Sequence, residues 1–388
     1  MRLPALALIL AASLPGAARA CGGDFGSFVQ GLKSEAVAKG QSAVTVDAFF
    51  KGVKQDGGVL KADRSQGVFQ KNFIDFSRSL ISGARLSNGA RNAQKFDKVF
   101  DRIERDYGVP RGVLLAFWAF ETDYGAVQGK FNTRNALVTL AHDCRRPELF
   151  RPQVFAAIEL FRRGDFDPAG TTGAWAGEIG QVQMLPDDIL RNGVDGDGDG
   201  HVTLKTSSAD ALASGGKMLR SLGWRPGEPW LQEITVPADL DWSKTGLNHS
   251  ASTGDWGRLG VRGRSAPLAQ GLQGSVLLPM GRKGPAFMAY PNFRVYFEWN
   301  KSFVYVTTAA YFATRLSGAP AYEAGNPEPG LSGKEMVTLQ KKLAAKGYDV
   351  GKIDGILGEN TREAVQREQQ RLGLPADAWP TKALLGKL

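Results

Sequence analysis

Apolar side chains recur at spacings of three and four residues along most of the chain, and this pattern limits the fold more than any other feature. Six segments carry it clearly: 25–39, 44–50, 94–107, 111–124, 152–163 and 208–222. This spacing places apolar side chains on one face of an α-helix. Patterns typical of strands are few, and the best candidate lies in 274–299. We therefore expect a mainly α protein with a few short strands and a further helix over 301–316.

The first twenty residues are predicted to be an export signal and not part of the fold. A basic residue precedes an apolar run over 3–14, and 18–20 has the small residues of a cleavage site. The apolar run is too short to span a bilayer as a mature helix. We therefore expect a periplasmic protein whose mature chain begins at Cys21.

Cys21 can be interpreted in two ways. The only other cysteine is Cys144, and two cysteines in an exported protein favour one disulfide, Cys21–Cys144. A cysteine at the first mature position could instead carry a lipid and associate the protein with a membrane. Residues 18 and 19 differ from the leucine and small residue that lipoprotein signals usually have there, so we expect the disulfide. A buried pair of free thiols is the third alternative.

The composition is that of an ordinary globular protein, with 388 residues of which 43% are apolar and 22% charged. The net charge is +9, from 48 Lys and Arg against 39 Asp and Glu. In an exported protein this charge suits an anionic polymer of the cell envelope, although a solvated basic surface explains it equally well. We expect a monomer with no nucleic-acid partner.

The C-terminal part of the chain reads as a separate unit. Residues 317–330 are rich in Gly, Pro and Ala without any period, which predicts a linker. Ser332 and Glu335 then form a capping box that opens the first of three predicted helices in 331–388. The expected organisation is therefore a main domain over 21–316, a linker and a small three-helix module.

One carboxylate lies within an aromatic stretch, WAFETDYG, at 118–125. On a helix, Phe117, Glu121 and Tyr124 share one face, with Trp118 close by. Burial there would disfavour the charged form and raise the pKa of Glu121, as a general acid at neutral pH requires. A glutamate that reaches water from the end of a helix is the simpler alternative, which periodicity alone leaves open.

A second stretch, GAWAGEIGQVQMLP at 173–186, is rich in Gly and Ala. Small residues let a backbone approach a ligand closely, and Gln183 offers both a donor and an acceptor to sugar hydroxyls or amides. As an isolated pattern it indicates only a glycine-rich loop.

An acidic loop, DGDGDGHVTLKTSSAD, follows at 195–210. Its aspartates alternate before a glycine, as in the calcium loop of an EF-hand, but the twelfth position is Thr206 and not glutamate. We predict a structural Ca²⁺, with an acidic solvated turn as the alternative. No cofactor is expected for catalysis, because the three histidines of the chain provide no set that would activate water. The candidate ligands are Asp195, Asp197, Asp199, His201 and Asp210.

These stretches together resemble the lytic murein transglycosylases of the membrane-bound lytic transglycosylase B type. The matching pieces occur in the order of that family: FETDYG, TLAHDCRRPELF, WAGEIGQVQMLP, the acidic loop and EWNKSFVYVTTAAYFATRL. The C-terminal stretch GYDVGKIDGILGENTREAVQREQ resembles the peptidoglycan-binding module often attached to such enzymes. The resemblance implies a lysozyme-like helical catalytic domain that acts on peptidoglycan glycan strands.

The resemblance also implies that Glu121 is the only catalytic carboxylate. It would protonate the glycosidic oxygen between N-acetylmuramic acid and N-acetylglucosamine. It would then accept the proton of the muramic acid C6 hydroxyl, which attacks C1 and closes a 1,6-anhydro ring without consuming water. A two-carboxylate glycosidase needs a second acid across the bond, and the Glu121 helix offers none at a useful spacing. Glu178 and Asp143 remain candidates for a helper.

Further residues match substrate-binding positions of that family. Gln183 resembles the glutamine that contacts the glycan, Asn300 the asparagine near the N-acetyl group, and Tyr305 the tyrosine that borders the cleft. Trp299 replaces a tyrosine of many members; it can stack on a sugar but lacks the hydroxyl donor. Ala174 replaces a serine, so a hydrogen bond from there to the catalytic carboxylate is missing.

Two alternatives to this function stay open at this point. A hydrolytic muramidase would use water and a second carboxylate to give reducing ends. A non-catalytic wall-binding scaffold would leave Glu121 idle and rely on the C-terminal module. The intact run of motifs around Glu121 argues against the scaffold.

Overall fold

Helices dominate the two ranges that the computed structural model describes, 21–65 and 71–388, and the predicted export signal lies outside them. In these ranges the helices are α1 (Phe25–Ala38), α2 (Ala43–Phe50), α3 (Gly57–Arg64), α4 (Phe73–Leu80), α5 (Gly83–Lys95), α6 (Asp97–Tyr107), α7 (Arg111–Thr122), α8 (Thr133–His142), α9 (Pro147–Arg163), α10 (Pro186–Asn192), α11 (Ser208–Ser221), the 3₁₀ turn η1 (Trp242–Lys244), α12 (Thr253–Arg258), α13 (Pro291–Trp299), α14 (Phe303–Leu316), α15 (Gly333–Ala345), α16 (Glu359–Arg371) and α17 (Lys382–Lys387). The strands are short: β1 (Phe131–Asn132), β2 (Thr172–Gly173), β3 (Leu231–Thr235), β4 (Ala251–Ser252), β5 (Arg262–Gly263), β6 (Gln273–Leu277) and β7 (Phe287–Ala289). The prediction of a mainly α protein with few strands is confirmed.

Each segment with helical apolar spacing is largely helical, but the spacing did not predict every helix. The predicted helix over 94–107 is divided, since α5 ends at Lys95 and α6 begins at Asp97. Helix α8 was not predicted, because every one of its residues is buried and its sequence therefore shows no polar face to define a period.

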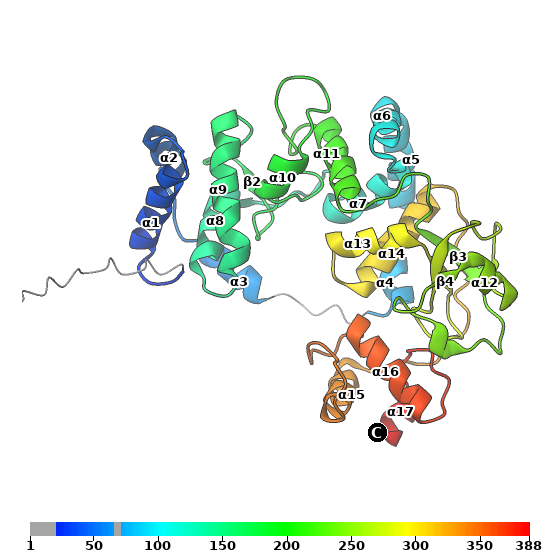
Figure 1. Cartoon of the computed structure of the whole chain (residues 1–388). Coiled ribbons are helices and arrows are strands. Elements are labelled where there is room, and N and C mark those ends of the chain that lie inside the picture. The colour runs from blue at the N-terminus through cyan, green and yellow to red at the C-terminus, as the bar shows by residue number, and fades with distance from the viewer. Residues whose placement is uncertain (1–20, 66–70) are drawn as a thin grey trace, which may run out of the picture.

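Helix α7 is the central element of the larger hydrophobic core. The side chains from Val113 to Ala119 are buried without a break, so this helix is surrounded by protein. Its closest neighbour is α14, which lies beside it in Figure 1. The close approach depends on Gly112, where a Cβ would lie only 2.9 Å from the carbonyl oxygen of Ala313 in α14. This contact sets the relative position of the two helices that carry most of the site.

Helices α1, α2, α8 and α9 form a second core at the opposite end of the molecule, shown in blue and green in Figure 1. Strands β3 to β7 form an antiparallel sheet in the order β4-β6-β7-β3-β5, which covers the side of the molecule beyond α13 and α14 (Figure 1). Two hydrophobic cores therefore flank the region in which α7 ends.

The expectation of strands over 274–299 holds only for its first part. Strands β6 and β7 form, and Val276 pairs with Met288 in an antiparallel register. The rest was wrong, because Pro291 starts α13 at its first helical positions. The aromatic residues that suggested strand instead lie on one helical face, where Phe293 and Tyr296 are buried.

The segment 317–330 has no regular secondary structure, as predicted, but it is packed against the protein. The ring of Tyr322 lies 5.3 Å from that of Phe73, and its hydroxyl is 2.9 Å from the hydroxyl of Ser77. Near the other end, the indole of Trp379 donates a hydrogen bond to the backbone oxygen of Glu328 at 2.8 Å. The segment therefore follows a fixed path to the C-terminal helices.

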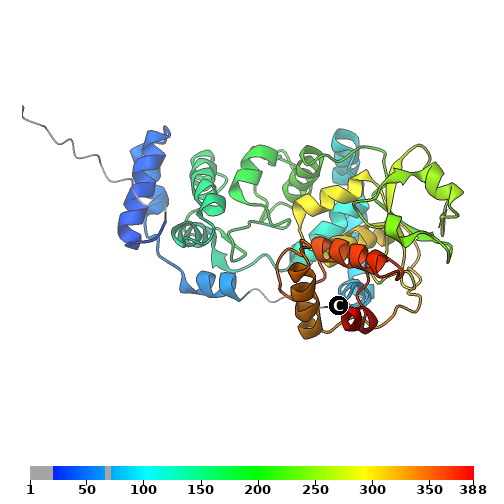
Figure 2. The ribbon, with the colours of Figure 1, turned by 60° about the horizontal axis from the view of Figure 1, so that its bottom comes forward.

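Helices α15, α16 and α17 enclose a small core of their own, and we call residues 331–388 the C-terminal module. Its first helix begins with the capping box that the sequence predicted, formed by Ser332 and Glu335. The module lies at the bottom of Figure 1 and comes forward in Figure 2. The core side chains of the module include Met336, Leu339, Leu343, Val350, Ala364, Val365 and Leu384.

Within the described residues, no helix is both long and apolar enough to cross a membrane.

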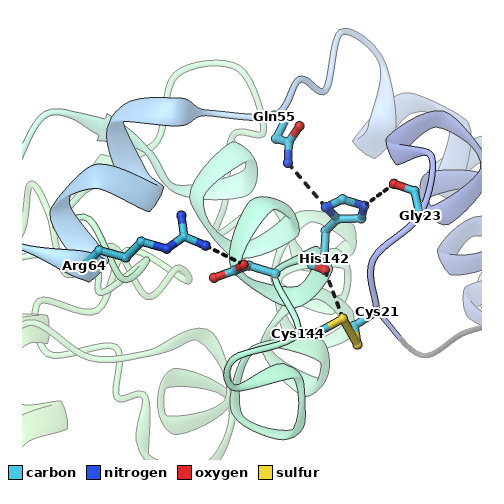
Figure 3. The surroundings of a disulfide bond; sticks show 7 residues. Cys21, Gly23, Gln55, Arg64, His142 and Cys144 are labelled. Carbon is cyan, nitrogen blue, oxygen red and sulfur yellow. Dashed lines mark hydrogen bonds and ion pairs between the residues drawn. A yellow bond between two sulfur atoms is a disulfide. The ribbon is translucent and has the colours of Figure 1, made fainter.

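A disulfide between Cys21 and Cys144 ties the start of the described chain to the end of α8 (Figure 3). His142 strengthens this connection, because its ring nitrogen Nε2 lies 3.0 Å from the backbone oxygen of Gly23. The backbone N–H of Gly22 also donates to the carbonyl oxygen of His142 at 2.7 Å. A sulfur atom in a disulfide cannot also carry a thioether-linked lipid, so this pairing and the lipid anchor exclude one another.

Replacement of Cys144 by Ser is expected to destabilise the protein by about 2–5 kcal/mol, because the bond closes a long loop and restricts the unfolded chain. Thermal unfolding of the oxidised protein, the reduced protein and Cys144→Ser measures this. The intact mass of the mature protein should rise by two hydrogen atoms on reduction. A larger mass, which reduction leaves in place and which corresponds to acyl chains, would contradict the disulfide.

Candidate active site

Glu121 lies at the C-terminal end of α7, where the helix stops abruptly. Asp123 follows the last helical residue with a left-handed backbone, φ 52°, which ends the helix as a left-handed C-cap does. The hydroxyl of Thr122 donates to the backbone oxygen of Gln181 at 2.6 Å. This buried bond connects the end of α7 to the glycine-rich stretch 173–186. Periodicity did not predict it, because the two partners are distant in the sequence.

The Glu121 carboxylate is held through one of its two oxygens. Oε1 accepts a hydrogen bond from the Tyr305 hydroxyl at 2.6 Å and another from the Trp299 indole N–H at 3.1 Å. Trp299 is the last residue of α13, and Tyr305 lies in the first turn of α14. Among the described residues no protein group bonds the other oxygen, Oε2. One oxygen is therefore fixed in place, and the second is available to a ligand.

Two opposing effects act on the pKa of Glu121. Burial among aromatic rings removes water from the carboxylate and raises its pKa, and this is the larger effect. The hydrogen bonds from Tyr305 and Trp299 stabilise the charged form and lower the pKa, without cancelling the effect of burial. The net shift is upward, as the sequence predicted for a general acid. Ala174 has only a methyl group and adds no donor.

Trp299 contacts the carboxylate in a way that the sequence interpretation missed. Its ring stacks on the ring of Phe117, with centroids 4.4 Å apart, and its N–H points to Glu121. The indole N–H is thus a hydrogen-bond donor to Glu121, although tryptophan lacks the hydroxyl of a tyrosine. Tyr305 packs edge-on against Phe120, at 5.8 Å between centroids. Both aromatic residues were expected to contact sugar, yet each one is bonded to Glu121.

Asn300 lies at the junction between α13 and α14, in an extended backbone conformation. Its side-chain oxygen accepts a hydrogen bond from the backbone N–H of Ser302 at 2.9 Å. The amide nitrogen has no protein partner among the described residues. Asn300 therefore lies directly beside Trp299 with a free donor.

Gln183 has a left-handed backbone, φ 52°, which is unusual for a residue other than glycine. Its side-chain nitrogen donates to the backbone oxygens of Gly180, at 2.7 Å, and Gln128, at 3.4 Å. The amide donors therefore stabilise the loop, and only the side-chain oxygen is left for a ligand. Gly180 is required by packing, because a Cβ there would lie 2.5 Å from the backbone of Leu204.

The two candidate helper carboxylates lie in different surroundings. The carboxylate of Asp143 is already paired with Arg64, with 2.8 Å between Oδ1 and Nη2. Glu178 lies close enough to Glu121 for that charge to act on it, and its Oε2 is buried without a hydrogen-bond partner. Burial chiefly, and then the charge of Glu121, raise the pKa of Glu178, despite backbone N–H groups that lower it. Burial and the charge of Glu121 therefore both disfavour the charged form of Glu178.

The acidic loop brings together three of its five candidate ligands. Oxygen atoms of Asp195, Asp197 and Asp210 lie within 4.8 Å of one another. His201 is not in this cluster, because its ring nitrogen Nδ1 lies 3.0 Å from a carboxylate oxygen of Asp165. Asp199 is also outside it, with one oxygen bonded to the backbone N–H of His201 at 2.9 Å. Clustered carboxylates are hard oxygen ligands and fit Ca²⁺.

Replacement of Tyr305 by Phe should raise the pKa of Glu121 further, because it removes a donor that stabilises the carboxylate and keeps the ring. A ¹³C NMR titration of the Glu121 carboxyl, assigned with Glu121→Gln, measures the shift. Tyr311→Phe is the matched control, since this buried tyrosine of α14 bonds Arg315 instead. An unchanged titration in Tyr305→Phe would show that the bond does not hold the carboxylate.

The chain is similar to known proteins in sequence and in fold. Residues 24–314 match the family described as transglycosylase SLT domain, and residues 332–388 match a putative peptidoglycan binding domain. The membrane-bound lytic murein transglycosylase B of Escherichia coli strain K12 is 26% identical over 234 residues, which are 59% of this chain and 63% of that protein. This chain thus spans less than two thirds of that relative's length.

Solved structures are similar over more of the chain. SltB3 from Pseudomonas aeruginosa, in complex with NAG-anhNAM-pentapeptide, superposes with a TM-score of 0.86 at 35% identity, over 94% of this chain and 99% of that one. Slt35 from Escherichia coli, in complex with calcium, superposes with a TM-score of 0.65 at 25% identity, over 76% and 95%. With the family matched over most of its length, the chain is a member of the transglycosylase SLT family.

Proposed function

We propose that this protein is a peptidoglycan lytic transglycosylase with Glu121 as its single acid and base. The observation that carries the proposal is the carboxylate itself, with one oxygen held by two donors and the other free. The names of its relatives support the substrate class, since one is a lytic murein transglycosylase and another was solved with NAG-anhNAM-pentapeptide. The bond cleaved would be the β-1,4 linkage from N-acetylmuramic acid to N-acetylglucosamine.

The first step uses the protonated form of Glu121, which burial favours. Transfer of this proton from Oε2 to the glycosidic oxygen breaks the bond to the muramic acid C1 and leaves a carboxylate. Tyr305 and Trp299 then stabilise the new negative charge through Oε1. The same two donors that oppose protonation before the step therefore favour the product of the step.

The second step returns the proton. The Glu121 carboxylate accepts the proton of the muramic acid C6 hydroxyl, and the C6 oxygen forms a bond to C1. The products are a 1,6-anhydro end and a free hydroxyl on the leaving sugar, and Glu121 is protonated again. No water enters the balance, and one carboxylate performs both proton transfers.

The hydrolytic alternative needs a carboxylate base that activates water. Glu178 is the described carboxylate whose pKa responds to Glu121, and burial together with that charge raises it. Both effects disfavour the charged form that a base needs, so they favour the transglycosylase over the muramidase.

Binding groups are proposed on the same grounds. Asn300 would use its free amide N–H on an acetyl oxygen, and Gln183 would use its side-chain oxygen on a sugar hydroxyl or amide. The C-terminal module would bind the wall polymer, as its match to a peptidoglycan binding domain suggests. The site of action would be the periplasm, with 1–20 as export signal and 21–316 as the catalytic domain.

A structural Ca²⁺ is proposed for the acidic loop. The cluster of Asp195, Asp197 and Asp210 supports it, together with the calcium complex of the similar Slt35 structure. The ion would join the start of the loop to α11, which holds Asp210. It would take no part in the proton transfers.

Digestion of purified peptidoglycan, with the released fragments weighed, tests the reaction. The wild-type protein should give anhydro ends, lighter by one water than hydrolysis products. Glu121→Gln should lower the rate by about 10²–10⁴-fold, because the proton donor is lost.

Glu178→Gln is the matched control for this experiment, since it replaces the other buried carboxyl group near Glu121 by an amide of similar size. It should keep the anhydro product and most of the rate. Reducing ends from the wild-type protein, or a Glu178→Gln variant as inactive as Glu121→Gln, would favour the two-carboxylate hydrolase. Wall binding without any release would favour the scaffold.

Addition of Ca²⁺ to chelator-treated protein should raise the free energy of unfolding, by about 2.7 kcal/mol at a concentration 100 times the Kd. The measurement is chemical unfolding with and without the ion. Asp197→Asn should lose this increase because it removes a ligand of the cluster. Asp187→Asn, an exchange outside the loop, should keep it. Equal stability of the wild-type protein in both conditions would exclude the site.

A further inference from the structure

The C-terminal module contacts the catalytic part through a buried arginine. Arg362, in the first turn of α16, is only 6% exposed. Its Nη2 donates to the backbone oxygen of Pro279 at 2.8 Å, and its guanidinium carbon lies 4.3 Å from the centre of the Phe303 ring. Figures 1 and 2 both show α16 on the side of the module that faces α13 and α14.

The ring of Phe303 and two nearby carboxylates face the charge of Arg362. Its Nε is buried without a hydrogen-bond partner. The acidic groups whose charge acts on it are Glu359 and Asp377, and neither of them is hydrogen-bonded to the guanidinium. Burial lowers the pKa of Arg362 to about 10, so it is still charged at neutral pH. A buried cation over an aromatic face is a strong and directional contact.

Polar contacts around the arginine fix the module in one orientation. The side-chain nitrogen of Gln366 donates to the backbone oxygens of Trp242, at 3.0 Å, and Thr245, at 2.9 Å. Asn248 donates to Glu363 at 2.8 Å. The bonds of Gln366 reach buried or half-buried backbone groups, and the Asn248–Glu363 bond lies at the surface. Together they attach the module to the catalytic part in a defined orientation.

Phe303 connects this interface to the catalytic carboxylate. It is the first residue of α14, and Tyr305, which donates to Glu121, lies in the same helical turn. Only the short segment 300–302 separates Phe303 from Trp299, the second donor. A shift of Phe303 would therefore move both donors relative to Glu121.

We propose that Arg362 of the C-terminal module is a positioning residue for the reaction, which acts through Phe303 to hold Tyr305 and Trp299 on Glu121. The module then contributes to the chemical step as well as to binding of the wall. The expected effect on the rate rests on the proposed function. The expected effect of Arg362 on the positions of Tyr305 and Trp299 does not depend on activity.

The test compares full-length variants. Arg362→Met removes the charge and keeps the length, and Arg362→Lys keeps the charge. Arg367→Met is the matched control, because this arginine of the same helix has a 65% exposed side chain and pairs with Glu363 at the surface. Phe303→Leu removes the ring from the other side of the contact and replaces Arg362→Met if that variant fails to fold, as judged by its unfolding transition.

Arg362→Met should lower kcat about ten- to hundredfold with little change in KM, because small displacements of catalytic groups reduce rates strongly. The alkaline limb of its pH–rate profile should move to higher pH, since a misplaced donor no longer favours the charged form of Glu121. Arg362→Lys should recover part of the rate, and Arg367→Met should behave as wild type. A change in KM or wall binding alone, with kcat and profile unchanged, would overturn the proposal.

The ¹³C titration of the Glu121 carboxyl in the same variants separates this inference from the proposed function. If the wild-type protein releases no anhydro product, the function fails, yet a raised pKa of Glu121 in Arg362→Met still supports the positioning. If the enzyme is active and the titration is the same in Arg362→Met and Arg367→Met, the positioning fails and the function stands.

Discussion

The opposition between desolvation and hydrogen bonding at Glu121 is the interaction on which the site depends. Burial favours the protonated acid, while Tyr305 and Trp299 stabilise the anion that remains after transfer. With burial alone, the carboxylic acid would release its proton with difficulty, and with donors alone it would be ionised and have no proton to give. The aromatic surroundings provide both effects, since the rings exclude water and two of them carry a polar hydrogen.

This balance needs donors from α13 and α14 to meet the end of α7. The glycine at position 112 lets α14 approach, and Thr122 connects the loop that carries Glu178 and Gln183. The contact between Arg362 and Phe303 extends the same support to the C-terminal module. The packing of helices from distant parts of the chain therefore sets the properties of one side chain.

Several elements could be predicted from local patterns alone. The amphipathic helices and the capping box at Ser332 were found because their signals lie within a few residues. Helix α8 gives no helical signal because full burial removes the polar face, and α13 resembles a strand because aromatic and β-branched residues are enriched in strands. At the acidic loop, spacing did not tell Asp210, which joins the cluster, from His201, which does not.

The sequence by itself determined that Glu121 lies on an apolar helix face, that the chain is mainly helical and that a small module follows. Those properties depend on residue type and near-neighbour spacing, which the chain carries in any conformation. Only the tertiary structure decided that Trp299 and Tyr305 bond the carboxylate, that Gln183 donates to nearby backbone oxygens and that Arg362 lies over the ring of Phe303. Each of these depends on directions between side chains far apart in the sequence, which packing alone establishes.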